Sequence, residues 1–316
     1  MDRGKDQMDT AAGITVIGGA NVDIGGTPYA PLREGDSNPG RVRLSVGGVG
    51  RNIAHNLRLL GLPVSFLTAL GKDAHGDRIA AECATAGMDC TRILRTHAES
   101  TSVYLFIADA SGEMQLAVSD MEICQLITPA YLAAHREVLD ASAALVLDAN
   151  LPEESIRYLA ETARAPLFAD PVSVSKAGRL HSALRYIHTL KPNRSEAELL
   201  SGIPIRTEAD LPRAADALLA AGVRRVFISL GTDGVFAAEP GRRLRLPCAP
   251  AHAVNMTGAG DAMMAGLVWS HVRGLGLEAA ARAAAAAAAI AVESTHTVNP
   301  ALSPAALRER APGLFA

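Results

Sequence analysis

Short apolar runs alternate with amphipathic or alanine-rich stretches along most of the chain. The apolar runs predict buried strands at residues 13–18, 64–70, 145–148, 166–169, 187–190 and 226–230. Helical spacing of hydrophobic positions predicts helices between them, including residues 48–60, 152–164 and 208–221. Apolar strands that alternate with helices are typical of a largely parallel sheet covered on both faces. The pattern therefore predicts an α/β protein of Rossmann-like type.

Two segments depart from this rhythm. Residues 27–46 are polar and turn-rich, and they end in the alternating run RVRLSV. Residues 102–108 and 114–118 flank the sequence DASG, which is a hairpin signature. We expect segments at about 25–46 and 99–120 to form a small β-sheet lid, and an ordinary edge hairpin is the alternative. A lid with an exposed face also allows a homodimer through the lid.

Composition restricts the class of protein. The chain has 316 residues, of which 49% are hydrophobic and 20% charged, so we expect one globular domain at residues 13–316. Residues 1–12 are charged throughout and predict a disordered leader. The net charge of −3, the scattered basic residues and the 4% aromatic content argue against a nucleic acid polymer as partner.

Cysteine usage and hydropathy indicate the compartment. Four cysteines lie far apart without a CxxC pair, which is typical of free thiols in a reducing compartment. The alanine-rich run at residues 279–292 contains Arg282 and is too short to span a bilayer. We therefore expect a cytoplasmic protein without a membrane partner.

The strongest chemical signal is the sequence TGAGD at residues 257–261, followed by an apolar helix. Gly258, Ala259 and Gly260 let backbone N–H groups converge at a helix N-terminus, which favours a negatively charged group. Asp261 lies in the first helical turn, where it could accept a proton from a hydroxyl. A helix-capping aspartate is the alternative interpretation, but it does not require the whole motif.

Two further motifs offer polar groups to a sugar. The sequence GGVGRN at residues 47–52 lets a ligand approach the backbone at Gly48, and the Asn52 amide can both donate and accept. Asn21 and Asp23 follow the first strand, at the edge where open α/β sheets bind ligands. A tight turn without function is the alternative for each motif.

Two later motifs suit a phosphate and a metal. In KPNRSE, Asn193 and Glu196 stand three residues apart at a strand-to-helix junction, and their oxygens suit magnesium. The same spacing fits a helix capping box, and both interpretations can hold together. SLGTDG at residues 229–234 is a glycine-rich loop after a strand, suited to a nucleotide or to a simple turn.

These motifs, in this order, resemble the ribokinase-like (PfkB) carbohydrate and nucleoside kinases across nearly the whole chain. The resemblance implies a β-sheet lid, ATP as the donor and a small sugar or nucleoside as the acceptor. It implies Asp261 as the catalytic base and the amides of residues 258–260 as an anion hole. It further implies that magnesium is organised by Asn193 and Glu196, that sugar is bound by Asn21, Asp23, Gly48 and Asn52, and that nucleotide is bound by Asn193, Ser229, Gly231, Thr232 and Gly234.

Within that family, the sequences DSNPG, GGVGRN and SDME resemble the pseudouridine kinase subgroup. The resemblance implies transfer to the 5′-hydroxyl of pseudouridine, with Ser37, Asn38, Thr101 and Tyr104 near the base. A kinase for another nucleoside or a free sugar (ribose, fructose) and a catalytically idle sugar or nucleoside sensor are the alternatives. Many members carry Asp where this chain has Asn255, and that carboxylate helps to hold a monovalent cation. The amide lacks the charge, which weakens the case for potassium.

Overall fold

The computed structural model describes residues 13–109, 114–249 and 251–312. The predicted leader at residues 1–12 and most of the predicted DASG turn lie outside the described residues.

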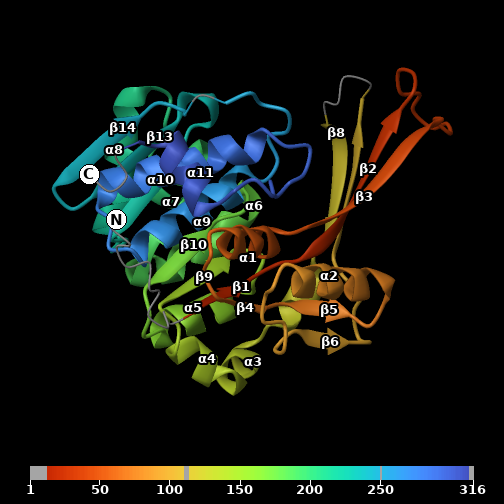
Figure 1. The fold of residues 1–316 in the computed structure, drawn as a ribbon, viewed down its shortest axis with the longest axis horizontal. Helices are drawn as coiled ribbons and strands as arrows, with labels where there is room; N and C mark the ends of the chain where they lie inside the picture. The colour runs from red at the N-terminus through yellow and green to blue at the C-terminus, as the bar shows by residue number, and fades with distance from the viewer. Residues whose placement is uncertain (1–12, 110–113, 250, 313–316) are drawn as a thin grey trace, which may run out of the picture.

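An eight-stranded sheet forms the centre of the main body (Figure 1). Its strands run in the order β14-β13-β12-β11-β10-β9-β1-β4, parallel from β4 to β12 and antiparallel at β13 and β14. The predicted mostly parallel sheet is thus confirmed. The strand bounds are β1 Ile14–Ile17, β4 Val64–Leu67, β9 Ala144–Asp148, β10 Leu167–Asp170, β11 Ile187–Leu190, β12 Arg225–Ser229, β13 Val235–Glu239 and β14 Arg242–Leu246.

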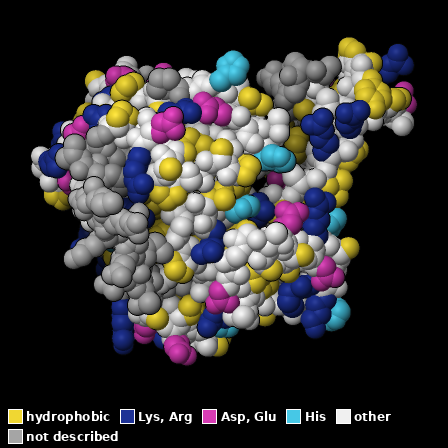
Figure 2. Space-filling view, viewed as in Figure 1, with side chains coloured by type: hydrophobic (Ala, Val, Ile, Leu, Met, Phe, Trp, Pro, Cys, Tyr) yellow, Lys and Arg dark blue, Asp and Glu magenta, His cyan; other side chains and the backbone are white. Residues whose placement is uncertain are grey.

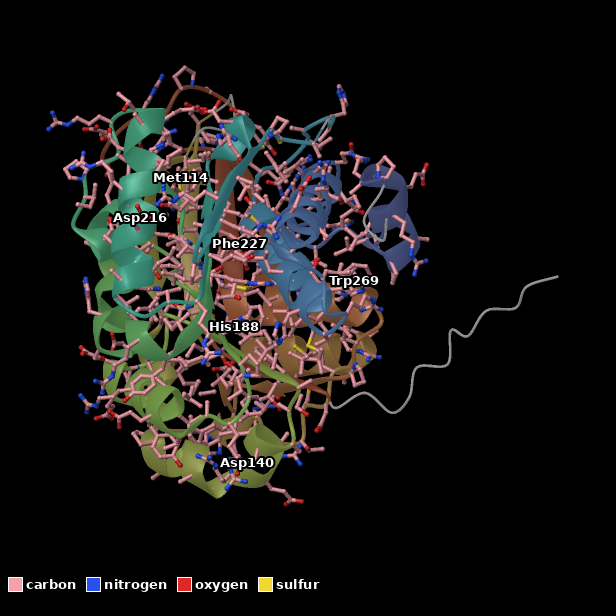
Figure 3. All side chains as sticks on the ribbon, turned by 90° about the vertical axis from the view of Figure 1, so that its left-hand side faces the viewer. Met114, Asp140, His188, Asp216, Phe227 and Trp269 are labelled. Atoms are coloured by element: carbon pink, nitrogen blue, oxygen red, sulfur yellow. The ribbon has the colours of Figure 1, made fainter. Side chains whose placement is uncertain are left out.

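Helices cover both faces of this sheet, and each face has its own apolar core. One core is built with α1 Val49–Leu59, α9 Ala259–His271, α10 Leu277–Val292 and α11 Pro304–Arg310. The other is built with α3 Pro129–Ala134, α4 Arg136–Asp140, α5 Glu153–Thr162, α7 Arg194–Ser201 and α8 Leu211–Ala220. In Figure 3, Phe227 on β12 and Trp269 on α9 mark the first core, to which both belong.

Most predicted elements are present, with differences at their ends. The strand expected at residues 64–70 is interrupted at Thr68, and its second half is β5 Ala69–Gly71, which pairs with β6 Leu94–Thr96 in a separate sheet. The helix expected from residue 208 begins with a 3₁₀ turn, Glu208–Asp210. Within the described residues, no helix is both long and apolar enough to cross a membrane.

A second, four-stranded sheet, which we call the lid sheet, stands away from the main body (Figure 1). It has the order β3-β2-β7-β8, with β2 Asn21–Pro28, β3 Gly40–Gly47, β7 Val103–Ala108 and β8 Met114–Asp120. One face carries exposed apolar side chains, among them Val42, Leu44, Leu105, Leu116 and Val118. The homodimer through the lid stays a prediction.

The start of the lid sheet corrects one expectation. Asn21 and Asp23 follow β1, but they lie in β2 instead of a loop of the main sheet, and three residues separate the two strands. The chain therefore passes from the core of the main body directly into the lid sheet. Polar side chains at this step lie on a strand of the lid sheet rather than on a loop of the main sheet.

Small residues let α9 and α10 pack closely. A β-carbon on Gly266 would lie 3.0 Å from the carbonyl oxygen of Ala283 and 3.0 Å from the Cα atom of Ala284. Ala284 itself is fully buried. The alanine-rich run is therefore a packing surface, as its composition predicts.

We predict that Ala284→Leu lowers the free energy of unfolding by about 1–3 kcal/mol, because the added side chain has no space between the two helices. Denaturant unfolding followed by circular dichroism would measure the change. Ala81→Leu, at an exposed position of α2 Ala74–Thr85, is the matched control and should change stability little. Equal effects of the two substitutions would contradict the packing argument.

Candidate active site

The aspartate of TGAGD is buried at the beginning of α9. Gly258 precedes the helix with φ of 86°, and a β-carbon there would lie 2.1 Å from the carbonyl oxygen of Thr297, so only glycine fits. Asp261 lies in the first turn, is 8% exposed and does not cap the helix. Its Oδ2 accepts a hydrogen bond from Asn52 Nδ2 at 2.9 Å. The two strongest motifs of the sequence thus meet.

The surroundings of Asp261 favour its protonated form. Burial, with a smaller contribution from the nearby Asp170 carboxylate, raises the pKa of Asp261 to about 8. The hydrogen bond from Asn52 and the charge of Lys191 act in the opposite direction. A carboxyl group with a pKa near neutrality is suited to take up a proton and release it again.

A buried ion pair lies beside this carboxyl group. Lys191 Nζ is 3.1 Å from Asp170 Oδ2, and both side chains are 6% exposed. Burial by itself would lower the pKa of Lys191, but Asp170, Glu196 and Asp261 outweigh it and raise the pKa. A β-carbon on Gly260 would lie 3.3 Å from the ammonium nitrogen. A fixed positive charge therefore lies next to the converging amides at the start of α9.

The glycine-rich turn before α1 holds the lid sheet against the main body. Gly48 has φ of 98°, and a β-carbon there would lie 2.5 Å from the Cα atom of Ala20. A β-carbon on Gly47 would meet the Asp23 carboxylate at 2.2 Å. Asn21 Nδ2 donates to Asp23 Oδ1 at 2.7 Å. Asn21 and Asp23 are therefore in contact with each other and lie beside the glycine-rich turn, where the lid sheet joins the main body.

Tyr104 lies on the same face of the lid sheet as Asp23. The two residues are direct neighbours across β2 and β7. The ring of Tyr104 lies 5.9 Å from that of Phe106, and its hydroxyl donates to the sulfur of Met114 at 3.3 Å. An aromatic surface therefore continues from the polar pair along the lid sheet.

The other three residues predicted to lie near the nucleobase, Ser37, Asn38 and Thr101, do not lie beside Asp23 and Tyr104. Asn38 closes its own turn: Oδ1 accepts from the Arg33 amide, and Nδ2 donates to the carbonyl oxygens of Arg33 and Asp36. Ser37 lies with it at the tip of the β2–β3 hairpin, roughly 15 Å beyond Asp23 at about 3.3 Å per residue.

Thr101 has a different environment from the one predicted. It is buried, its hydroxyl accepts from the Gly71 amide at 2.9 Å, and it donates to Asp73 Oδ1 at 2.8 Å. Asp73 also caps α2 by accepting from the Gly76 amide. Thr101 therefore fixes the segment that enters β7 instead of facing a ligand.

A cavity of about 540 Å³ opens beside the start of α9. All five residues predicted to bind nucleotide line it, together with Ala259 and Gly260 of the predicted anion hole. None of its described lining residues is acidic or aromatic, and its walls include Ala253, Met256 and Ala285. An apolar slot that reaches Ala259 and Gly260 at the start of a helix suits a flat base joined to phosphates.

The residues predicted to organise magnesium form a complete capping box. Asn193 Oδ1 accepts from the Glu196 amide at 2.9 Å, and Glu196 Oε2 accepts from the Asn193 amide at 2.8 Å. Burial raises the pKa of Glu196. Among the described residues there is no group of three or more His, Cys, Asp or Glu side chains that could hold a metal ion. The residues present fit magnesium held mainly by phosphates and waters, with Glu196 near, rather than a closed protein cage.

Three polar residues at the same edge of the sheet were not predicted as site residues from the sequence: Asp148, Asn150 and Asp170. Asp148, at the end of β9, accepts from the Gly19 amide at 2.9 Å, and burial raises its pKa. Asn150 is buried, and its Oδ1 accepts from Lys176 Nζ at 2.6 Å. The signal was present: Asp148 and Asp170 each end a buried apolar run, as polar ligand-binding residues do in such sheets.

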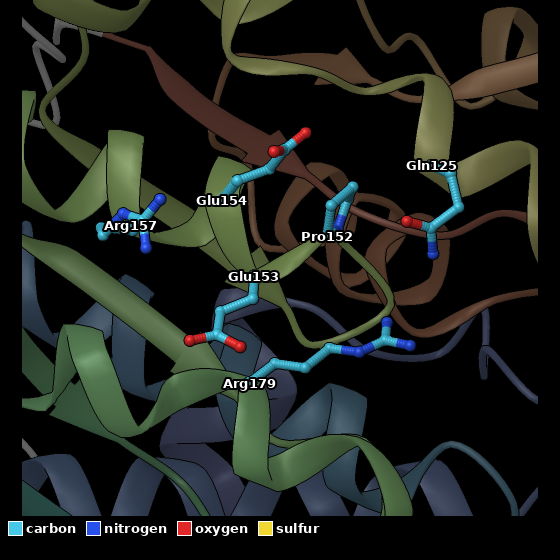
Figure 4. A pocket seen from close by; sticks show the side chains of 6 residues that line it. All are labelled: Gln125, Pro152, Glu153, Glu154, Arg157 and Arg179. Atoms are coloured by element: carbon cyan, nitrogen blue, oxygen red, sulfur yellow. The ribbon is translucent and has the colours of Figure 1, made fainter.

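A surface depression of about 550 Å³ lies next to the loop that follows β9, residues 149–152 (Figure 4). Arg179 in its wall donates to the carbonyl oxygens of Ala149, Asn150 and Leu151 at 3.1–3.3 Å. Glu153 and Glu154 line the same depression, and their charges disfavour a phosphate. We therefore assign Arg179 the role of bracing the loop that carries Asn150.

Asn255 bridges the loop before TGAGD and the segment after α10. Its Oδ1 accepts from the Thr257 amide at 3.0 Å, and its Nδ2 faces the carbonyl oxygen of Thr295 at 3.5 Å. The Asn255 amide thus faces both segments, whereas a carboxylate in its place would have no N–H group to donate to the Thr295 carbonyl oxygen.

The chain is similar to known kinases over almost its full length. It is 39% identical to pseudouridine kinase of Escherichia coli K12 over 92% of this chain and 93% of that protein. It is also 39% identical to an uncharacterized sugar kinase, YeiI, of the same organism, over 91% of this chain and 80% of that protein.

The fold has a solved counterpart, and a family model matches the sequence. The structure of Arabidopsis thaliana ribokinase complexed with ribose and ATP superposes with a TM-score of 0.86 at 24% identity, covering 96% of this chain and 99% of that one. The model of the pfkB family carbohydrate kinases matches residues 11–304. Together with the geometry of Asp261, this match means that the chain belongs to the pfkB family of carbohydrate kinases.

Proposed function

We propose that this kinase uses ATP to phosphorylate the 5′-hydroxyl of pseudouridine. The observation that carries the proposal is the position of Asp261. This residue directly follows Gly260, which lines the cavity that suits a nucleotide, and its carboxyl group is bonded to Asn52 on α1. That helix begins where β3 ends, and β3 pairs with Asn21 and Asp23, which suit a sugar diol. Donor and acceptor sites therefore meet at one group able to take a proton.

In the proposed reaction, the acceptor hydroxyl oxygen attacks the γ-phosphorus of ATP. A new O–P bond forms, the bond to the β-phosphate oxygen breaks, and ADP leaves with that electron pair. Asp261 takes the hydroxyl proton as the oxygen attacks. The backbone amides of residues 258–260 and the Lys191 ammonium group stabilise the charge that develops on the transferring group.

Magnesium would be held near Asn193 and Glu196, mostly through waters and the phosphates of ATP. When bound, it neutralises phosphate charge and orients the phosphates for in-line transfer. The capping box uses one carboxylate oxygen of Glu196 and keeps this side chain at the start of α7.

The choice of acceptor rests on the relatives and on the lid sheet. Equal identity to a pseudouridine kinase and to an uncharacterized sugar kinase keeps a free sugar as the second candidate. The aromatic surface of Tyr104 and Phe106 beyond Asp23 favours a nucleoside, because it offers contact area to a base attached to the sugar. A catalytically idle sensor is disfavoured, because it would not need the buried Asp261 carboxyl group, the backbone amides of residues 258–260 and the Lys191 ammonium group together.

We predict that pseudouridine gives the highest kcat/KM in a panel that also contains uridine, inosine, ribose and fructose. ADP release with magnesium and ATP measures turnover, and phosphorus NMR of the product identifies the phosphorylated hydroxyl. Preference for a free hexose over every nucleoside would replace the proposal by a sugar kinase. Nucleoside binding without ADP release would indicate a sensor.

We predict that Asp261→Asn lowers turnover by roughly 10²–10⁴, because the proton acceptor is lost. In the native protein, kcat/KM should rise with pH through about 8, since the base acts when deprotonated and burial raises the pKa of Asp261 to about 8. An Asn variant that keeps most of the activity would show that this assignment is wrong.

Thermal unfolding gives the control for correct folding. The pKa of Asp261 is about 8 in the folded state and about 4 in the unfolded state, so the folded state holds the extra proton between these values. The contribution of Asp261 to the free energy of unfolding therefore falls as pH rises from 4 to 8. The Asn variant has no group that titrates here, so its stability does not fall for this reason. Its Tm should exceed that of the native protein increasingly from pH 5 to pH 8. Asp216→Asn, on α8, should show no such trend.

We predict that activity does not depend on potassium, because the Asn255 amide already provides an N–H group toward the Thr295 carbonyl oxygen. Turnover should be equal in potassium chloride and choline chloride at the same ionic strength. Asn255→Asp places two acceptors face to face, and this variant should need a monovalent cation. Activation of the native protein by tenfold or more with potassium would contradict the prediction.

A further inference from the structure

Arg51 is a buried arginine next to the active site. It follows the glycine-rich turn on α1 and is 5% exposed. Its Nη1 donates to the carbonyl oxygen of Val46 at 3.3 Å and to Asn52 Oδ1 at 3.2 Å. Its Nη2 pairs with Glu82 Oε2 on α2 at 3.2 Å. One guanidinium group therefore joins β3 of the lid sheet, α2 and the amide that contacts Asp261.

These contacts determine how the Asn52 amide is oriented. A guanidinium group has only donors, so the Asn52 atom that it touches must be the carbonyl oxygen Oδ1. The NH₂ group of Asn52 then has to lie at the opposite end, where it donates to Asp261 Oδ2 at 2.9 Å. The reversed amide would place its oxygen against the Asp261 carboxylate, which only a protonated carboxyl group tolerates.

We propose that Arg51 is a positioning residue for the catalytic base, holding the Asn52 amide so that its N–H group always faces Asp261. The proposal rests on the proposed function in taking Asp261 as the base. Arg51 itself reaches neither the nucleotide cavity nor, in the described contacts, the Asp261 carboxyl group. It acts through Asn52, and its effect is to favour the ionised form of the base.

The contacts run from Arg51 through Asn52 to Asp261, and different charged groups surround Arg51 and Asp261. Asp261 faces Asp170 and Asp148 from β10 and β9, and Lys191 from the end of β11. None of these groups is bonded to Arg51.

Around Arg51 lie Glu82, the thiol of Cys83, the imidazole of His55 and the carboxyl group of Asp23. Since these groups belong to the other end of the chain of contacts, a change at Arg51 reaches Asp261 mainly through the Asn52 amide.

The fork of the guanidinium group is what this position requires. Two of its nitrogens serve three acceptors on separate elements, a geometry that a lysine ammonium group on a flexible stem reproduces only in part. The Arg51 backbone amide also donates to the carbonyl oxygen of Gly19 at 3.1 Å, which fixes the start of the side chain. We expect Arg51→Lys to retain part of the function and Arg51→Gln to lose it.

The outer end of the contacts reaches the surface and provides a matched control. Glu82 also pairs with Arg78 at 3.2 Å, and Arg78 has a 44% exposed side chain. Both arginines line a hollow of about 500 Å³ between the base of the lid sheet and residues 295–300. Figure 2 shows basic, acidic and histidine side chains gathered where the lid joins the main body. Arg78→Gln removes an arginine from Glu82 without touching Asn52.

The test measures the titration of Asp261 directly. Carbon NMR of protein labelled at aspartate carboxyl groups, with the Asp261 signal assigned from Asp261→Asn, follows this group in the free protein without substrate. Arg51→Gln should raise its midpoint by about one pH unit, as expected for a weakened hydrogen bond to a charged group. Arg51→Lys should lie between, and Arg78→Gln should match the native protein.

Kinetics give the second readout. In Arg51→Gln, the acidic limb of kcat/KM for the nucleoside should move upward with the NMR midpoint and cost about tenfold at pH 7, while KM for ATP stays unchanged. An unmoved midpoint in folded Arg51→Gln, or an equal shift in Arg78→Gln, overturns the positioning role. A shifted midpoint in a protein that phosphorylates no nucleoside refutes the proposed function and leaves the positioning role standing.

If Arg51→Gln does not fold, Glu82→Gln replaces it, since it loosens Arg51 from α2 while both Asn52 contacts remain. Its midpoint should then rise less than that of Arg51→Lys. A larger rise in Glu82→Gln than in Arg51→Lys would overturn the proposal.

Discussion

The hydrogen bond between Asn52 and Asp261 joins residues that are 209 positions apart, and the rest of the site depends on it. It ties α1, which leaves the lid sheet, to α9, which carries the amide turn. Both partners are buried, so losing either would leave an unpaired polar group in the interior, which is costly. The glycines before the two helices fix where each helix starts, because a side chain at Gly48 would meet Gly19 and Ala20 and one at Gly258 would meet Thr297.

Several carboxyl groups are buried at one edge of the main sheet, so positive charges and hydrogen-bond donors must lie beside them. Asp148, Asp170 and Asp261 are met by Lys191 and Lys176, with backbone amides supplying the remaining donors. This arrangement does not maximise stability, since buried ion pairs rarely exceed apolar packing in that respect. On the proposed function, it would provide a fixed field that needs no rearrangement when a phosphoryl group is transferred.

The alternation of strands and helices and the turns at the glycine motifs could be predicted well from the sequence, because both depend on short stretches. Residues 257–261 and 47–52 were correctly placed as helix-starting turns, and their meeting followed from the sheet edge that they share. Asn38 and Thr101 could not be placed, because their partners Arg33 and Asp73 were chosen by tertiary geometry that no local pattern reports. Lys191 and Arg51 were visible inside motifs, but only burial reveals why a cation is needed there.

Asp23 is part of the lid sheet, whereas the nucleotide cavity is lined from the main body alone. A rigid tilt of the lid sheet would therefore carry the Asp23 carboxylate with it and leave the cavity beside α9 unchanged. On the proposed function, capture and enclosure of the acceptor would be one movement of the lid sheet. The cavity proposed for the donor would not change with that movement.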